Sequence, residues 1–263
     1  MSSATLTISD SAGRVIREYS NVAPPVDTTM PNVPEYWLMP PLALSTTAGM
    51  HRVAWDLRYA DPPTLNYGYS GTLLDYREYT LSWHAIPGKT PRSTLVGPMV
   101  VPGTYTATLA VNGKTVTQPI TVVPDPRVPA AHAALTAQFQ LQQRMVVGIT
   151  TTYHAVNCVQ QLRAAIAKRL ASGSPDGASA LKALDAALAP LDGSGGVFGL
   201  AHRDLGRRLN DQLVADFAPT PSVTAGVDMP CASIDKGLAT LRSLDVSALA
   251  DVPRWTPPSQ SCR

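Results

Sequence analysis

The stretch Val122-Val-Pro-Asp-Pro-Arg-Val-Pro129 divides the 263-residue chain into two halves of different composition. Each of its prolines lacks an N–H donor and restricts the residue before it to extended backbone, so we expect neither a helix nor a strand to cross the stretch. We therefore predict a first domain at residues 1–124, a Pro-rich linker at 125–130, a second domain at 131–250 and a tail at 251–263.

The first half has the composition and patterning of antiparallel β-structure. Sixteen of the 24 prolines and 11 of the 16 aromatic residues precede position 130, which is typical of strands and ordered loops. The clearest hairpin is formed by two alternating segments, residues 103–111 and 114–123, separated by Asn112-Gly113. Asn-Gly is the preferred pair for a two-residue type I′ turn. Pro119 indicates that the second segment is an edge strand or contains a bulge.

Two more regions of the first half predict strands. Residues 5–9 and 14–19 alternate polar and apolar side chains around a turn that contains Gly13. Residues 50–57 form another candidate strand, with Trp55 expected in the core beside Tyr105. Short alternating strands separated by turn signals favour an antiparallel β-sandwich.

The second half predicts helices. It is rich in alanine and leucine, and its apolar residues recur at spacings of mostly three, four or seven, which is the pattern of amphipathic helices. Four such helices with short to moderate loops favour an antiparallel helical bundle, here a four-helix bundle at 131–250. The predicted fold class is therefore α+β with separate halves, a sandwich followed by a bundle.

Charge and hydropathy exclude some function classes. The formal net charge is +2 and the mean hydropathy is zero, so the chain has neither the basic footprint of a nucleic-acid-binding protein nor a polybasic membrane patch. No apolar run approaches the ~18–20 residues that a membrane helix needs. The first ten residues contain no basic region and no apolar stretch, so we expect no secretory signal in this chain.

Few residues form a pattern that indicates chemistry. The five histidines have no metal-ligand spacing, and no phosphate-binding, nucleotide-binding or catalytic motif occurs. We therefore expect no metal, no cofactor and no catalytic residues, and do not favour catalysis by this chain alone. The cysteines Cys158, Cys231 and Cys262 form no Cys-x-x-Cys unit and allow three single pairings. Cys158 lies inside a predicted helix and is expected to be a buried thiol.

An irregular insert at about residues 58–98 is unusually aromatic. Amphipathic rings stack on sugars and peptides, so one interpretation is a ligand-binding platform. The other is that a long loop over the sandwich needs aromatic residues for a small core of its own. Asp56, Asp61 and Asp75 are candidate carboxylates nearby. The candidate ligand-binding residues are Tyr67, Tyr69, Tyr76, Tyr79, Trp83 and His84.

Several motifs of the first half resemble known families. The segments at 7–17 (Thr-Ile-x-Asp-x-x-Gly-x-Val-Ile-Arg), 48–56 (Ala-Gly-x-His-x-Val-x-Trp-Asp) and 102–106 (Pro-Gly-Thr-Tyr-Thr) resemble the immunoglobulin-like domain of the flagellar hook-capping protein. More closely, the segments at 50–59 (Met-His-Arg-Val-Ala-Trp-Asp-Leu-Arg-Tyr), 101–106 (Val-Pro-Gly-Thr-Tyr-Thr) and 125–128 (Asp-Pro-Arg-Val), followed by a Gln-rich helix, resemble the C-terminal region of bacterial sortilin-like β-propeller proteins. Proteins of that kind are often labelled glycosyl hydrolases.

The resemblance implies a fold, a function and a compartment. It implies an immunoglobulin-like sandwich in a non-catalytic accessory or scaffold module, like the C-terminal end of a secreted propeller protein. The implied partner is a β-propeller domain or subunit, and the implied location is periplasmic or extracellular. For an exported protein we would pair Cys231 with Cys262. The alternative function is a carbohydrate-binding or hydrolase-associated module whose aromatic insert contacts glycan.

Overall fold

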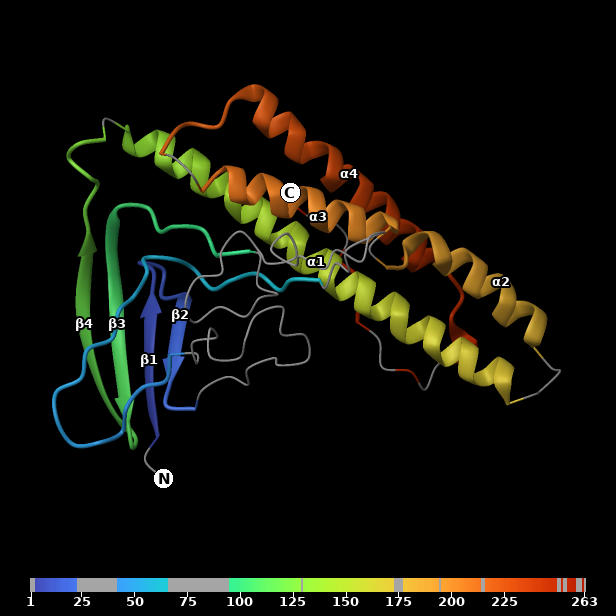
Figure 1. Ribbon diagram of the computed structural model, residues 1–263, viewed down its shortest axis with the longest axis horizontal. Coiled ribbons are helices and arrows are strands. Elements are labelled where there is room, and N and C mark those ends of the chain that lie inside the picture. The colour runs from blue at the N-terminus through green and yellow to red at the C-terminus, as the bar shows by residue number, and fades with distance from the viewer. Residues whose placement is uncertain are drawn as a thin grey trace, which may run out of the picture. The chain divides into compact units, whose positions relative to one another are not determined.

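In the computed structural model the chain is an α+β protein, with one antiparallel sheet in its first half and helices in its second (Figure 1). The structure describes residues 3–22, 42–65, 95–128, 130–172, 177–193, 195–213, 216–249, 252, 255–258 and 262. These residues divide into two compact units, which are considered separately. The first holds the described residues up to 61, those of 95–139 and 216–218, and the second holds 62–65, 140–213 and those from 219 onward.

The sheet of the first unit has four strands in the order β2-β1-β3-β4. All neighbouring strands are antiparallel, and β1 pairs with both β2 and β3 (Figure 1). The strands are β1 (Ala4–Ser9), β2 (Val15–Ser20), β3 (Gly103–Val111) and β4 (Lys114–Val122).

The predicted hairpin is confirmed. Val111 of β3 pairs with Lys114 of β4, and the two residues between them have positive φ, 48° at Asn112 and 80° at Gly113. This is the backbone that a type I′ turn requires. Strand β4 lies at the edge of the sheet, as Pro119 predicted.

The core of the first unit lies on one face of this sheet. Ile8, Ile16, Val100 and Tyr105 form a buried cluster against which Trp55 packs. The rings of Trp55 and Tyr105 meet edge-to-face with 5.6 Å between centroids, a favourable aromatic geometry. Tyr105 is buried as predicted, whereas Trp55 is only partly buried.

The predicted strand at residues 50–57 was wrong. The Asp56 carboxylate accepts a hydrogen bond from the Arg58 N–H at 3.2 Å, and Leu57 has φ of 57°. An Asx turn followed by a left-handed residue ends extended backbone. Only an isolated bridge, Arg58 to Met99, remains in this part of the described chain, so Val53, Trp55, Leu57, Tyr59 and Val100 pack on the sheet from irregular segments.

The second half contains four α-helices among its described residues, as predicted. Thr220 caps α4 by accepting a hydrogen bond from the Val223 N–H, and Pro221 occupies the first turn, where its missing donor costs nothing. The helices are α1 (His132–Ala171), α2 (Ala178–Leu188), α3 (Val197–Asp211) and α4 (Pro221–Ser243), with short 3₁₀ turns η3 (Ala189–Leu191) and η4 (Ser247–Leu249). None of these helices is both long and apolar enough to cross a bilayer.

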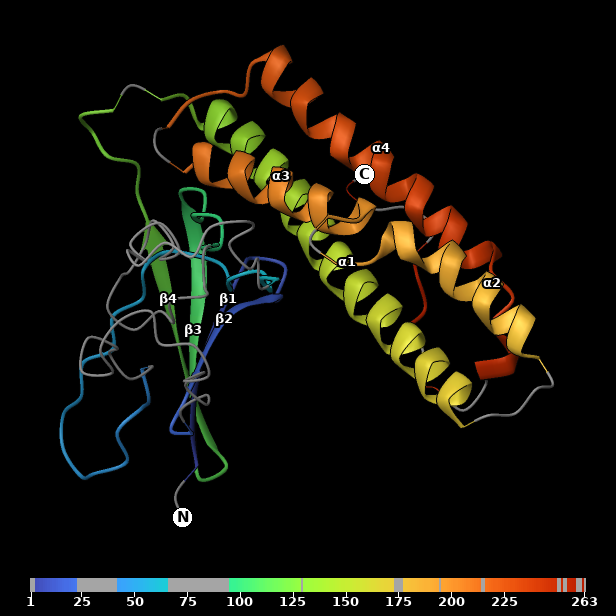
Figure 2. The same cartoon turned by 45° about the vertical axis from the view of Figure 1, so that its right-hand side comes forward.

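Helices α3 and α4 pack together closely in the second unit, and α1 lies along them (Figure 2). A Cβ on Gly237 of α4 would lie 2.9 Å from a ring carbon of Phe198 in α3, so the missing side chain sets how near the two helices come. The shared core consists of fully buried apolar side chains from all three helices: Met145, Ile149, Val159, Phe198, Leu205, Leu209, Val227, Ile234 and Leu238.

The hairpin turn gives a first prediction. Gly113→Ala should lower the free energy of unfolding by about 1–2 kcal/mol, because a Cβ disfavours the left-handed backbone at φ 80°. Chemical denaturation followed by tryptophan fluorescence measures the loss.

Gly103→Ala is the matched control for this variant. Gly103 begins the same hairpin, but it does not have positive φ, and a Cβ there would meet its nearest atom at 3.8 Å. Equal losses in the two variants would contradict the turn assignment.

Candidate functional site

The centre of the second unit contains a buried histidine with partners on both ring nitrogens. His202 of α3 is fully buried, and its Nε2 accepts a hydrogen bond from the Leu65 N–H at 3.3 Å. Its Nδ1 lies 3.2 Å from the Ile149 carbonyl and 3.0 Å from Thr152 Oγ1. Since the Leu65 N–H requires an acceptor, the arrangement fits a neutral imidazole with its proton on Nδ1.

Burial controls the protonation of this imidazole. Loss of solvation lowers the pKa of His202 to about 4, and the hydrogen bond with the Ile149 carbonyl opposes this only in part. The imidazole is therefore neutral at physiological pH. It joins three segments that are distant in sequence: α1, α3 and the backbone at Leu65.

The contact between His202 and Thr152 resembles a nucleophile and its base, but its surroundings make it structural. The Thr152 hydroxyl lies within 2.9 Å of the Gly148 and Ile149 carbonyls, where it donates back to its own helix. Thr152 and His202 are both fully buried. A catalytic pair must reach a substrate, whereas these two groups satisfy each other and the backbone.

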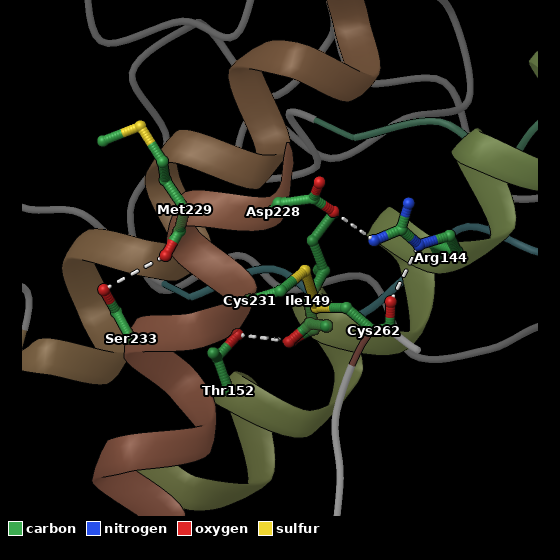
Figure 3. The surroundings of a disulfide bond; sticks show 9 residues. Arg144, Ile149, Thr152, Asp228, Met229, Cys231, Ser233 and Cys262 are labelled. Atoms are coloured by element: carbon green, nitrogen blue, oxygen red, sulfur yellow. Dashed lines mark hydrogen bonds and ion pairs between the residues drawn. A yellow bond between two sulfur atoms is a disulfide. The ribbon is translucent and has the colours of Figure 1, made fainter. Parts of the chain in front are cut away.

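A disulfide lies against α1 at Gly148, one helical turn before Thr152. Cys231 of α4 is bonded to Cys262, with 5.7 Å between their Cα atoms (Figure 3). Cys231 and Cys262 are the two cysteines that we expected to be paired if the protein is exported. Gly148 makes room for it, because a Cβ there would overlap the Cys262 sulfur and come within 2.6 Å of Leu205 Cδ1. Cys158 is buried in α1 and is not part of the bond.

Arg144 holds the residues around the disulfide in place. Its Nε donates to the Cys262 carbonyl at 2.9 Å, and its Nη2 lies 2.7 Å from Asp228 of α4 (Figure 3). One guanidinium thus ties α1 to α4 and to the segment that carries Cys262.

A second ion-pair cluster connects α1 to the helices that follow it. Arg163 lies between Asp185 of α2 and Asp192 after η3, and its Nε donates to Asp185 at 2.8 Å. The hydrogen bonds to Asp185 and Asp192 raise the pKa of the guanidinium, and the bond from Arg163 lowers the pKa of Asp185. All three groups are partly exposed, so we assign the cluster to positioning rather than to stability.

Two of the candidate carboxylates lie around one arginine in the first unit. Asp56 is 3.6 Å and Asp61 4.0 Å from the guanidinium of Arg17. Asp61 also accepts a hydrogen bond from the Gly97 N–H at 2.8 Å. These contacts hold irregular backbone next to the sheet. Asp75 lies outside the described residues.

The aromatic residues proposed as a ligand platform also lie outside the described residues, so that interpretation stays a prediction. They are Tyr67, Tyr69, Tyr76, Tyr79, Trp83 and His84. Within the described part of the chain, no three His, Cys, Asp or Glu side chains gather as a metal ion would require.

Sequence analysis missed the centre at His202. It grouped the five histidines by metal spacing, whereas the useful signal was the position of His202 on the apolar stripe of α3, between Phe198 and Leu205. A histidine on an apolar stripe is expected to be buried and hydrogen-bonded. No pattern in the sequence indicated that position 148 requires a glycine.

Comparison with known proteins gives no match: no family model, no curated protein and no solved structure is similar to the chain.

The histidine centre predicts a pH-dependent stability. The neutral form is favoured in the folded state, so the stabilisation is complete above the ordinary pKa of 6.5 and is lost as the pH falls towards the folded value of about 4. When the pH is lowered from 7.5 to 4.5, the free energy of unfolding of the wild type should fall by roughly 2.5 kcal/mol more than that of His202→Gln, by the linkage relation. Urea denaturation of both proteins at both pH values measures this difference. Equal acid losses in the two proteins would contradict the assignment.

The disulfide predicts a second stability effect. Cys231→Ala/Cys262→Ala should lower the free energy of unfolding by about 3–4 kcal/mol, since the bond closes a loop across a separation of 31 residues. Guanidinium denaturation measures the change. Cys158→Ala, which keeps the bond, is the matched control and should cost about 1 kcal/mol. A double variant no less stable than this control would refute the prediction.

Proposed function

We propose that the chain is a non-catalytic accessory or scaffold module of an exported protein, which accompanies a β-propeller domain or subunit. The resemblance of its sheet motifs to the C-terminal region of sortilin-like propeller proteins suggests the partner. The sheet and the helical half are the architecture that this resemblance leads us to expect.

The observation that supports the proposal most directly is that the described polar side chains bind other parts of the fold. His202, the one buried histidine among the described residues, and the Thr152 hydroxyl beside it bind backbone groups of two segments, α1 and the residues at Leu65. Arg144 and Arg163 each lie between groups of different parts of the helical unit, and Arg17 of β2 binds Asp56 and Asp61 of the irregular segment beside the sheet. Groups that would serve as acid, base or nucleophile in an enzyme hold secondary-structure elements together here, as a rigid module requires.

The disulfide supports export. Cys231 is 2% exposed and Cys262 is fully buried. Structural disulfides persist in oxidising compartments such as the periplasm and the extracellular space. A periplasmic or extracellular location is therefore part of the proposal.

We also propose the finer architecture that the resemblance implies. The apolar face of the sheet contacts Val53, Trp55, Leu57, Tyr59 and Val100, which suits the second layer of an immunoglobulin-like sandwich. The common core of α1, α3 and α4, with α2 attached through Arg163, suits an antiparallel four-helix bundle.

An activity assay tests the absence of catalysis. We expect no turnover when the purified chain is incubated with aryl glycosides and polysaccharides, since glycosidases need two opposed carboxylates across a cleft. Asp61→Ala/Asp75→Ala is the comparison. Hydrolysis by the parent that this variant loses would overturn the proposal.

Binding measurements test the scaffold role itself. If a neighbouring reading frame encodes a β-propeller, the two proteins should co-purify after joint export. Glycan binding by calorimetry without turnover, lost in Tyr76→Ala/Trp83→Ala, would instead favour the carbohydrate-binding alternative.

A further inference from the structure

Several described residues that follow η4 contact the helices of the second unit. The described residues after η4 are Val252, residues 255–258 and Cys262, and we refer to them together as the strap. The strap ends in the disulfide, where the Cys262 sulfur occupies the space left by the missing side chain of Gly148.

Among the described residues, four non-covalent contacts hold the strap in addition to the disulfide. The Val252 N–H donates to the Leu249 carbonyl at 3.0 Å. The Trp255 ring stacks on the exposed ring of His154 with 5.8 Å between centroids, and Arg242 donates to the Pro258 carbonyl at 2.6 Å on the surface. Arg144 donates to the Cys262 carbonyl. Of the described strap residues, only Cys262 is buried.

The backbone at Cys262 also depends on its surroundings. Its φ is 35°, a left-handed conformation that residues with a side chain adopt only when neighbouring groups hold them there. The disulfide and Arg144 are those groups. Ordering each strap residue costs conformational entropy, which these four non-covalent contacts of the described residues offset poorly.

The three helices, in contrast, have contacts that do not involve the strap. Phe198 of α3 packs against Gly237 of α4, and Leu238 is fully buried in the same core. Arg144 also reaches Asp228 directly. The helices therefore have the means to stay packed without the disulfide.

We propose that the strap is a redox-controlled latch, closed by the Cys231–Cys262 disulfide and released from the packed helices when that bond is reduced. In reduction by a dithiol, a reagent thiolate attacks one cysteine sulfur, the S–S bond breaks, and the other cysteine leaves as a thiolate that takes up a proton. The second reagent thiol then displaces the first cysteine and closes the reagent's disulfide. Two electrons pass to the protein, and two cysteine thiols result.

The position of the sulfurs sets the order of events. Since Cys231 and Cys262 are both buried, a reductant reaches them only after the strap opens locally. In the opposite direction, the Cys262 thiol can reach Cys231 once α1, α3 and α4 have formed the space at Gly148, and an external oxidant such as molecular oxygen or a small-molecule disulfide takes the two electrons and two protons as the S–S bond forms. The latch thus closes last, in an oxidising compartment.

Limited proteolysis of the full chain tests the release. Trypsin can cleave after Arg254, immediately before the strap residue Trp255. With dithiothreitol, or in Cys262→Ala, we expect this cleavage to accelerate about tenfold or more, as local opening without a covalent restraint allows. The far-UV circular dichroism of the helices should be unchanged. Cys158→Ala, which retains the bond, should be cleaved like the wild type.

Two results of this experiment would overturn the proposal. An unchanged cleavage rate after reduction would mean that non-covalent contacts alone hold the strap. A loss of helical signal together with the faster cleavage would mean that the strap belongs to the cooperative core rather than forming a latch.

Closure is tested separately at Gly148. Gly148→Ala adds a Cβ that would overlap the Cys262 sulfur, so air oxidation of the reduced protein should form the bond about tenfold or more slowly, as an obstructed thiol reacts. Gly226→Ala is the matched control, since its Cβ would meet only the flexible end of Arg208. If Gly148→Ala forms the disulfide as fast as the wild type, the space at Gly148 is not required for closure, and this part of the proposal is refuted.

Discussion

The helical unit depends on how closely other groups approach the α1 backbone at Gly148. A side chain there would overlap the Cys262 sulfur and crowd Leu205 of α3. Because glycine has only a hydrogen at this position, both the sulfur and the leucine can reach the helix backbone. One turn earlier Arg144 binds the Cys262 carbonyl, and one turn later Thr152 contacts His202. These three residues are spaced four apart and so share one face of the helix.

That face of α1 replaces apolar packing by specific contacts. Its arginine, glycine and threonine each fit particular partners, whereas the leucines and isoleucines beside them would tolerate several arrangements of similar volume. The buried imidazole adds to this selectivity, because a polar group inside a core must find its own partner or lose the free energy of its solvation. The helices are thereby fixed in register as well as held together.

Local patterns in the sequence were enough to predict the elements but not their contacts. Asn112-Gly113 defined a hairpin, and the spacing of leucines and alanines predicted the helices, since both depend on neighbouring residues alone. The strand expected at 50–57 was wrong because Asp56 turns the backbone, although its alternation suited a strand. The space at Gly148 has no local signal, since it arises from contacts between helices. The spacing of His202 from Phe198 and Leu205 indicates its burial but not its partners. The aromatic insert and its candidate site lie outside the described residues.

Pro119 affects whether the edge strand β4 can pair with a strand of another molecule. In a hairpin whose Val111–Lys114 pair closes a two-residue turn, hydrogen-bonded and non-hydrogen-bonded pairs alternate, and Thr106–Pro119 falls on a non-hydrogen-bonded pair. The proline therefore interrupts no bond between β3 and β4. Its missing donor belongs to the outward row of β4, where a strand from another molecule would have to bind. The ring removes a hydrogen bond from the middle of any such pairing, so this edge resists aggregation at no cost to the hairpin.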